Sequence, residues 1–205
     1  MQAGDILFKF IIILISLVIH EFAHAYAAYK NGDETAMRAG RLTLNPLPHL
    51  DMVGSIILPL VIAFSTGGGF FGWAKPVPIN PNNFRNYKKG LIITSFAGVF
   101  ANICIAIIFG ILIRVLSAQS LLTIPMHFIL SYIVLINISL FLFNLIPIPP
   151  LDGSKILSAL LPYNKARDFE SFMDRYKYIF LLIIILFFSA IIFPIALFLY
   201  HLFTG

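Results

Sequence analysis

The residues best suited to chemistry are His20, Glu21 and His24, which form the pattern H-E-x-x-H in His20-Glu21-Phe22-Ala23-His24. Side chains four positions apart share one helix face, so both imidazoles can converge on one metal ion, and neutral imidazole is a common zinc ligand. Glu21 projects beside them, where its carboxylate can accept a proton from a water that the metal activates.

The same pattern also occurs on solvated helix faces, and a lone buried histidine is more often a core residue than a ligand. Here the three ionisable groups lie within an apolar run that begins near Ile6. Placing such groups in an apolar segment is costly, so their presence indicates a function. We therefore interpret His20 and His24 as zinc ligands and Glu21 as the catalytic base.

The composition is that of a membrane protein, because 60% of the 205 residues are hydrophobic and only 11% are charged. Several apolar runs are long enough to cross a bilayer. We predict an all-α integral membrane protein that forms a single polytopic domain over residues 1–205, with about five to six transmembrane helices. The predicted spans are residues 6–29, 91–115, 126–146 and 178–203, with a shorter span at 52–65.

The net charge of +5 is interpreted as a signal of membrane topology. The basic residues are scattered through loops without interleaved aromatic residues, which disfavours a nucleic-acid partner. By the positive-inside rule, the loops near Arg41, Lys88 and Lys165 are cytoplasmic, so the H-E-x-x-H pattern lies towards the cytoplasm.

No small-residue cleavage site follows the first apolar run, so we expect a retained span and not a signal peptide. Cys104 is the only cysteine, which excludes an internal disulfide.

A catalytic zinc usually has three protein ligands and one open position, so a third ligand is expected. Asp51 and Asp152 are the candidates, because the other acidic residues lie at the opposite end of a span, in polar loops or among basic residues. Asp152 is favoured, since it follows a proline-rich stretch at the cytoplasmic end of a span. The alternative is that Asp152 caps the short helix that follows. His49 and Asp51 lie in a loop broken by prolines, which favours an ordinary interfacial loop.

Two further features each allow two interpretations. Asn102 is an amide deep within a predicted span, where it forms an interhelical hydrogen bond or donates towards the active site. Residues 66–83 are too rich in glycine and proline for a helix. They form either a short re-entrant or β-like segment whose edge pairs with an unwound substrate, or a linker anchored at the interface by Trp73.

The H-E-x-x-H pattern occurs together with a second pattern, Asn144-x-x-Pro147-x-Pro149-x-Leu151-Asp152-Gly153. In this combination the chain resembles the site-2 protease family of intramembrane zinc metalloproteases. The resemblance covers nearly the whole chain, including the Gly98-x-x-x-Asn102 element and the stretch from Gly72 to Pro78. Val99 departs from the pattern, because many members have proline there. No inserted PDZ-like or appended CBS-like domain is recognised, so a compact form is expected.

The resemblance implies one Zn2+ held by His20, His24 and Asp152, with Glu21 as the base. It also implies that Asn102 and Asn144 support the reacting peptide. The expected activity is hydrolysis of peptide bonds in or near the transmembrane segment of a single-span membrane-protein substrate, that is, regulated intramembrane proteolysis. The expected location is a prokaryotic cell membrane, with the active site towards the cytoplasm.

Two other functions would use the same residues. A membrane metal-ion transporter or metal-handling protein could bind its ion at the His/Asp site, but five spans without an internal repeat argue against this alternative. A different membrane zinc protease would take a glutamate as its third ligand. Glu21 is the only glutamate within a predicted span, which argues against that enzyme.

Overall fold

The computed structural model describes residues 3–58, 61, 72 and 74–205, and these residues contain helices but no β-strand. The chain divides into two compact units, residues 1–90 and residues 91–205. Three helical segments of the described residues are long and apolar enough to cross a membrane: Leu7–Lys30, Tyr87–Ala118 and Ile124–Asn144. The prediction of an α-helical integral membrane protein is confirmed, whereas the predicted count of five to six spans is not.

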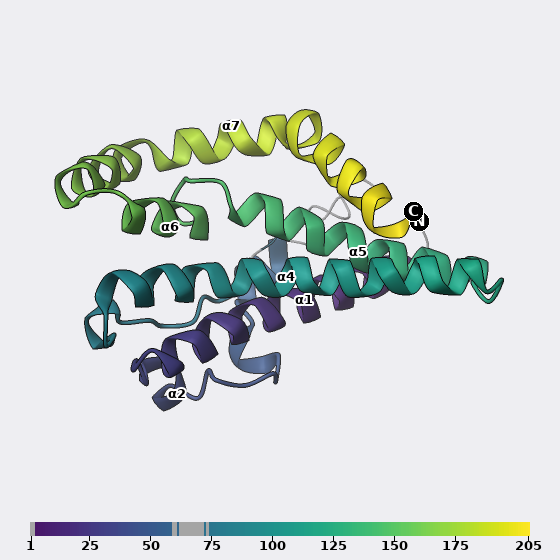
Figure 1. The fold of residues 1–205 in the computed structure, drawn as a ribbon, viewed down its shortest axis with the longest axis horizontal. Helices are drawn as coiled ribbons and strands as arrows, with labels where there is room; N and C mark the ends of the chain where they lie inside the picture. The colour runs from purple at the N-terminus through teal and green to yellow at the C-terminus, as the bar shows by residue number, and fades with distance from the viewer. Residues whose placement is uncertain (1–2, 59–60, 62–71, 73) are drawn as a thin grey trace. The chain divides into compact units, whose positions relative to one another are not determined.

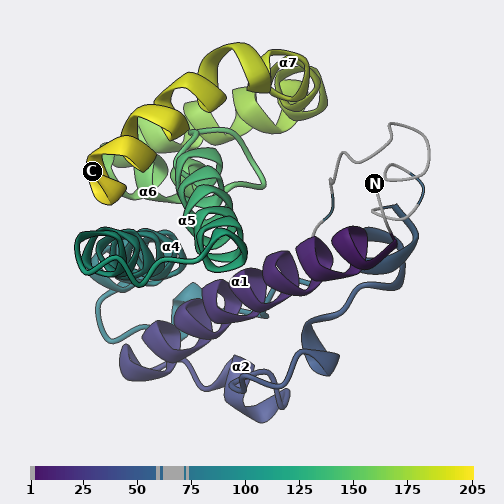
Figure 2. The same ribbon diagram turned by 90° about the vertical axis from the view of Figure 1, so that its right-hand side faces the viewer.

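The first unit is organised around α1 (Ala3–Lys30), which carries the H-E-x-x-H pattern. The chain leaves α1 through Gly32, whose φ of +108° favours glycine. The short helix α2 (Thr35–Arg38) then lies beside the C-terminal part of α1, as Figure 2 shows. Ala25 of α1, Ala36 of α2 and the distant Val77 form a small buried cluster that holds these parts of the unit together.

The predicted short span at residues 52–65 is seen only in part. The described portion contains a 3-10 turn, η1 (Leu47–His49), and a six-residue π-helix, η2 (Met52–Ile57). Six helical residues rise about 9 Å, far less than the roughly 30 Å of a bilayer core. The rest of the predicted span, apart from residues 58 and 61, lies outside the described residues.

Residues 74–80, which we call the strap, form neither helix nor strand and lead through Asn80, whose backbone is extended, into the 3-10 turn η3 (Pro81–Asn83). Their conformation follows from the sequence, because Lys75, Val77 and Asn80 each precede a proline and are thereby restricted to extended conformations. The β-like segment predicted here is therefore extended but forms no strand among the described residues. The other part of that prediction, including the Trp73 anchor, lies outside them.

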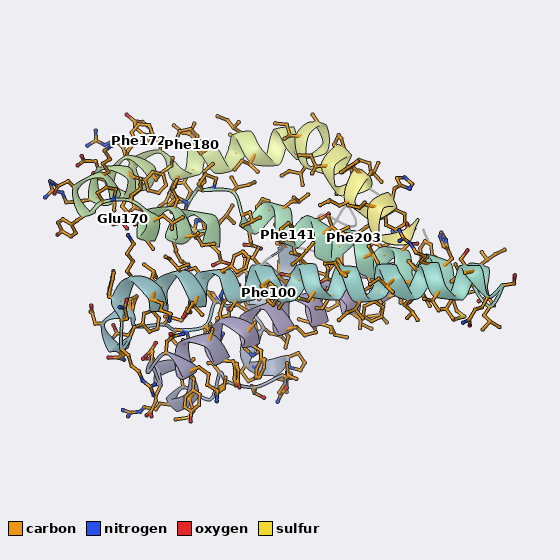
Figure 3. All side chains as sticks on the ribbon, in the orientation of Figure 1. Phe100, Phe141, Glu170, Phe172, Phe180 and Phe203 are labelled. Carbon is orange, nitrogen blue, oxygen red and sulfur yellow. The ribbon has the colours of Figure 1, made fainter. Side chains whose placement is uncertain are left out.

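The second unit contains α5 (Ile124–Asn144), α6 (Asp152–Leu160), α7 (Tyr163–Thr204) and all but the first turn of α4 (Tyr87–Ala118). Its core lies where α4, α5 and α7 meet, and its buried residues are Ala106, Ile113, Leu130, Val134, Ile138 and Ala196. Gly110 permits a close approach of α4 and α7, because a Cβ atom there would lie 2.6 Å from the Cβ of Phe203, which is labelled in Figure 3.

Helix α7 begins at Tyr163, well before the span predicted at residues 178–203, and is continuous as far as Thr204. No proline or glycine interrupts the sequence between Pro162 and Pro194, so one helix runs through the charged and the apolar part. The helix is visibly bent in Figure 1 and contains Pro194. Its charged first half lies beside α6, where the Ser158 hydroxyl donates to Glu170 (Figure 3). Within α7, the apolar stretch found by length and composition is the shorter Ala190–Thr204.

Candidate metal centre and active site

The two histidines of the H-E-x-x-H pattern converge as predicted. The Nε2 atoms of His20 and His24 lie 3.0 Å apart, and both side chains are buried. Two nitrogens at the usual 2.0–2.1 Å from a tetrahedral zinc would lie about 3.3 Å apart. The observed separation is close to that value, so the donor pair fits a zinc ion.

Glu21 lies between the histidines in sequence and is half-buried. Its Oε2 atom accepts a hydrogen bond of 2.8 Å from the backbone N–H of Val77, a residue of the strap. The Glu21 carboxylate is therefore hydrogen-bonded to a residue that lies 56 positions away in the sequence but in the same unit. Sequence reasoning did not identify Val77, although the Lys75-Pro76-Val77-Pro78 pattern that holds it extended is visible in the sequence.

The rival ligands His49 and Asp51 both have structural partners in the first unit. The ring Nε2 of His49 lies 2.9 Å from the Thr43 carbonyl oxygen, which can only accept, so this nitrogen is the donor. Asp51 is the N-cap of η2, and its Oδ1 atom accepts from the N–H of Gly54 at 2.7 Å. These contacts favour the interpretation of residues 43–51 as an ordinary loop.

Asp152 lies in the second unit, where it is the first residue of α6 and is 5% exposed. The N-cap of that helix is Leu151, so Asp152 does not occupy the capping position. Its Oδ1 atom lies 3.3 Å from the Nζ atom of Lys155. A carboxylate in the first turn of a helix is also favoured by the helix dipole.

Gly153 fixes the position of Asp152 by close packing. A Cβ atom at residue 153 would lie 2.2 Å from the carbonyl oxygen of Leu145 and 2.6 Å from that of Ile146. Only glycine allows the start of α6 to lie this close to the end of α5. The need for glycine here is steric.

The two asparagines proposed to support the peptide make contacts within the second unit. Asn102 is fully buried in α4, and its Nδ2 atom donates to Oδ1 of Asn137 in α5 at 2.9 Å. Asn144, the last residue of α5, donates to the Leu140 carbonyl in its own helix at 3.0 Å. The interhelical hydrogen bond considered for Asn102 is therefore present. Its partner Asn137 was missed, although an amide within an apolar span is itself a signal.

Comparison with known proteins identifies the family. The sequence profile of peptidase family M50 matches residues 8–188, which is most of the chain. This chain belongs to peptidase family M50. The resemblance to site-2 proteases inferred from the two motifs is thereby confirmed.

Among curated proteins, this M50 chain is 40% identical over 157 residues to the "Putative zinc metalloprotease YwhC" of Bacillus subtilis, a match covering 74% of the chain and 68% of that protein. It is 30% identical to the "Putative zinc metalloprotease Rip2" of Mycolicibacterium smegmatis, covering 84% of the chain and 63% of that protein. The corresponding protein of Mycobacterium tuberculosis is 28% identical, with 85% and 64% covered. The chain thus spans about two thirds of the length of these relatives. No solved structure matches it significantly.

These relatives carry zinc in their names, and the donor chemistry of the M50 chain agrees with that metal. His20 and His24 supply two buried imidazole nitrogens at a separation suited to tetrahedral coordination. Zn2+ is the cofactor that the family and this donor pair together indicate. The chain is accordingly a membrane-embedded member of a family of metalloproteases.

Proposed function

We propose that this protein is a zinc metalloendopeptidase that hydrolyses peptide bonds in or near the transmembrane segments of single-span membrane proteins. The observation that carries the proposal is the 3.0 Å approach of the His20 and His24 Nε2 atoms within an apolar helix that also carries Glu21. Membership of peptidase family M50 supports hydrolysis over transport of a metal ion through the same site.

His20, His24 and Asp152 are the proposed ligands of one zinc ion. Two observations support Asp152. In the sequence, elimination among the acidic residues leaves only Asp152 and Asp51 as third ligands, and the surroundings of the two residues differ. Asp51 caps η2, whereas Asp152 is buried in a turn that Gly153 holds by close packing. A carboxylate held this rigidly suits a metal ligand, which requires fixed geometry.

The bound zinc would lower the pKa of a water molecule towards neutrality and polarise the scissile carbonyl. Glu21 accepts the proton that the attacking water loses and returns it to the nitrogen of the leaving amine, so no net proton remains on the enzyme. Asn102 and Asn144 support the reacting peptide through their amide groups. Each amide donates one hydrogen bond within the second unit, and an amide NH2 group carries two N–H donors, so that bond is compatible with this role.

The substrate segment must unwind before cleavage, because a helix keeps its carbonyl groups in internal hydrogen bonds. The Gly/Pro-rich residues 66–83 are the proposed site for holding an unwound peptide. Within the strap, the N–H groups of Lys75, Val77 and Asn80 already donate to His49, Glu21 and Asp33. Pro76 and Pro78 have no N–H, so none of these five strap residues has a backbone N–H left for pairing with a substrate.

We place the active site on the cytoplasmic side of a prokaryotic cell membrane. The support is the basic loop that follows α1, with Lys30, Arg38 and Arg41. The three curated relatives named above come from bacteria. Water reaches a site near this end of α1 more readily than one at the centre of the bilayer.

The deciding experiment compares wild type with Glu21→Gln in proteoliposomes containing a single-span reporter whose transmembrane segment carries a Gly-Pro helix break. We expect Glu21→Gln to retain zinc, measured by atomic absorption, and to lose cleavage. Cleavage at the wild-type rate by Glu21→Gln would refute the role of Glu21 as base. Zinc flux across the vesicle membrane with an intact reporter would instead establish the transporter alternative.

A further inference from the structure

The strap is fixed to the first unit by several residues that no motif includes. Arg41 is 7% exposed, and its Nη2 atom donates to the Lys75 carbonyl at 2.6 Å and to the Pro76 carbonyl at 3.4 Å. The N–H of Lys75 donates to the His49 carbonyl at 2.9 Å. The strap is therefore held at Lys75 and Pro76, the two residues immediately before Val77.

The far end of the strap is held by a buried carboxylate. Asp33 is fully buried, and its Oδ2 atom accepts from the N–H of Asn80 at 2.7 Å. Val77 lies between these two attachments, with its side chain packed in the cluster that contains Ala25 and Ala36. Its N–H is thereby directed at Glu21 by a backbone that has little freedom to move.

We propose that the N–H of Val77 is a positioning donor that orients the Glu21 carboxylate for proton transfer. Arg41 holds the strap in the position that this hydrogen bond requires. This inference rests on the proposed function, in which Glu21 is the base. The Val77 N–H occupies one carboxylate oxygen, Oε2, and fixes the rotation of the carboxylate about its final bond. The other oxygen, Oε1, is then held in one orientation, in which it accepts the proton and later returns it.

The proposal predicts a specific spectroscopic signature that does not depend on activity. In protein labelled with 15N-valine, the Val77 amide signal is assigned as the one that Val77→Ala removes. Glu21→Gln keeps an acceptor oxygen, so the Val77 amide should exchange with solvent as slowly as in wild type. Glu21→Ala removes the acceptor, and exchange should become about tenfold faster. Equal exchange in Glu21→Ala and wild type would overturn the proposal.

The functional part is tested with Val77→Pro and its matched control Val77→Ala. Proline removes the N–H but suits an extended residue between two prolines, whereas alanine keeps the N–H and shortens the side chain. For cleavage of the single-span reporter, we expect Val77→Pro to lower kcat by about 10- to 100-fold, the range for one hydrogen bond to a charged group. KM and zinc content should match those of Val77→Ala. Equal kcat in the two variants would overturn the proposal.

Arg41→Lys provides a second variant should Val77→Pro fail to fold. Lysine keeps the positive charge but replaces the planar guanidinium by a point charge that cannot hold the strap in the same way. We expect faster exchange of the Val77 amide and a lower kcat together. A changed Val77 signal with wild-type kcat would overturn the proposal. Wild-type cleavage by Glu21→Gln would instead overturn the proposed function itself, so the two failures are distinguishable.

Discussion

The carboxylate of Asp33 accepts the backbone N–H of Asn80 at 2.7 Å, joining two segments that are 47 positions apart. Its other oxygen accepts the side-chain amide of Asn83 at 2.8 Å and the N–H and hydroxyl groups of Thr35. One buried side chain thus connects the loop after α1 to the end of the strap. The organisation of the first unit depends on this carboxylate.

Replacing Asp33 should destabilise the first unit. Asp33→Ala would leave buried donors without an acceptor, and we expect it to lower the free energy of unfolding by about 3 kcal/mol. Asp33→Asn keeps the shape and one acceptor oxygen, so its effect should be smaller. Thermal unfolding in detergent, followed by circular dichroism, measures both variants. A melting temperature for Asp33→Ala equal to that of wild type would contradict this interpretation.

The same residue predicts how stability depends on pH. Burial by itself would raise the pKa of Asp33, but the hydrogen bonds from Thr35, Asn83 and Asn80 outweigh it and hold the pKa below its ordinary value of 3.8. A lowered pKa in the folded state adds stability above the unfolded-state pKa, and this stability is lost as the pH falls through the folded-state pKa. The difference in melting temperature between wild type and Asp33→Asn should therefore shrink below about pH 4. A difference that stays constant down to pH 2 would argue against this linkage.

The choice of third zinc ligand is tested by comparing Asp152→Ala with Asp51→Ala. We expect Asp152→Ala to lose most of its bound zinc and its cleavage of the reporter, because two imidazoles alone hold the ion weakly. Asp51→Ala removes only the cap of η2, so it should keep its zinc and lose about 1 kcal/mol of stability. Metal content after dialysis against a weak chelator separates the two. Zinc lost from Asp51→Ala and kept by Asp152→Ala would reverse the assignment.

Gly153→Ala should be far more damaging than the size of a methyl group suggests. The new Cβ would meet the backbone carbonyl of Leu145 at 2.2 Å, and a backbone atom cannot move aside as a flexible side chain can. We expect a loss of about 2–3 kcal/mol in stability together with weaker zinc binding. Gly4→Ala is the matched control, because nothing lies within 4 Å of a Cβ at that position. Similar melting temperatures for the two variants would contradict the close-packing argument.

The hydrogen bond between Asn102 and Asn137 predicts that the two residues act together. Single and double alanine variants should show a coupling energy of about 0.6 kcal/mol in stability, which is typical of such bonds between membrane helices. Reporter cleavage in the same variants tests the proposed role of Asn102 at the peptide, for which a loss of at least about 100-fold in kcat is expected. Equal activity losses in Asn102→Ala and Asn137→Ala would limit Asn102 to holding α4 against α5.

The sequence by itself determined which side chains converge on α1, because their contact is local. Two residues four positions apart on a helix must share a face, so the spacing of His20 and His24 was sufficient to predict their convergence. The apolar runs likewise predicted the three described helices that are long enough to cross a membrane, since length and composition decide which segments can span a bilayer. The alternation of prolines around Val77 also contained the information that the strap is extended, although it gave no partner for that residue.

Only the tertiary structure decided which distant residues meet. The contact of Glu21 with Val77 spans 56 positions, and that of Asn102 with Asn137 spans 35. No periodicity links residues so far apart, because such pairs form through the packing of whole segments against one another. The same reason applies to Gly153. A side chain is excluded at this position because the carbonyl oxygens of Leu145 and Ile146 lie too close. The continuity of α7 was also decided by the structure. Its change from charged to apolar residues resembles the boundary between two helices, but no glycine or proline ends the helix there.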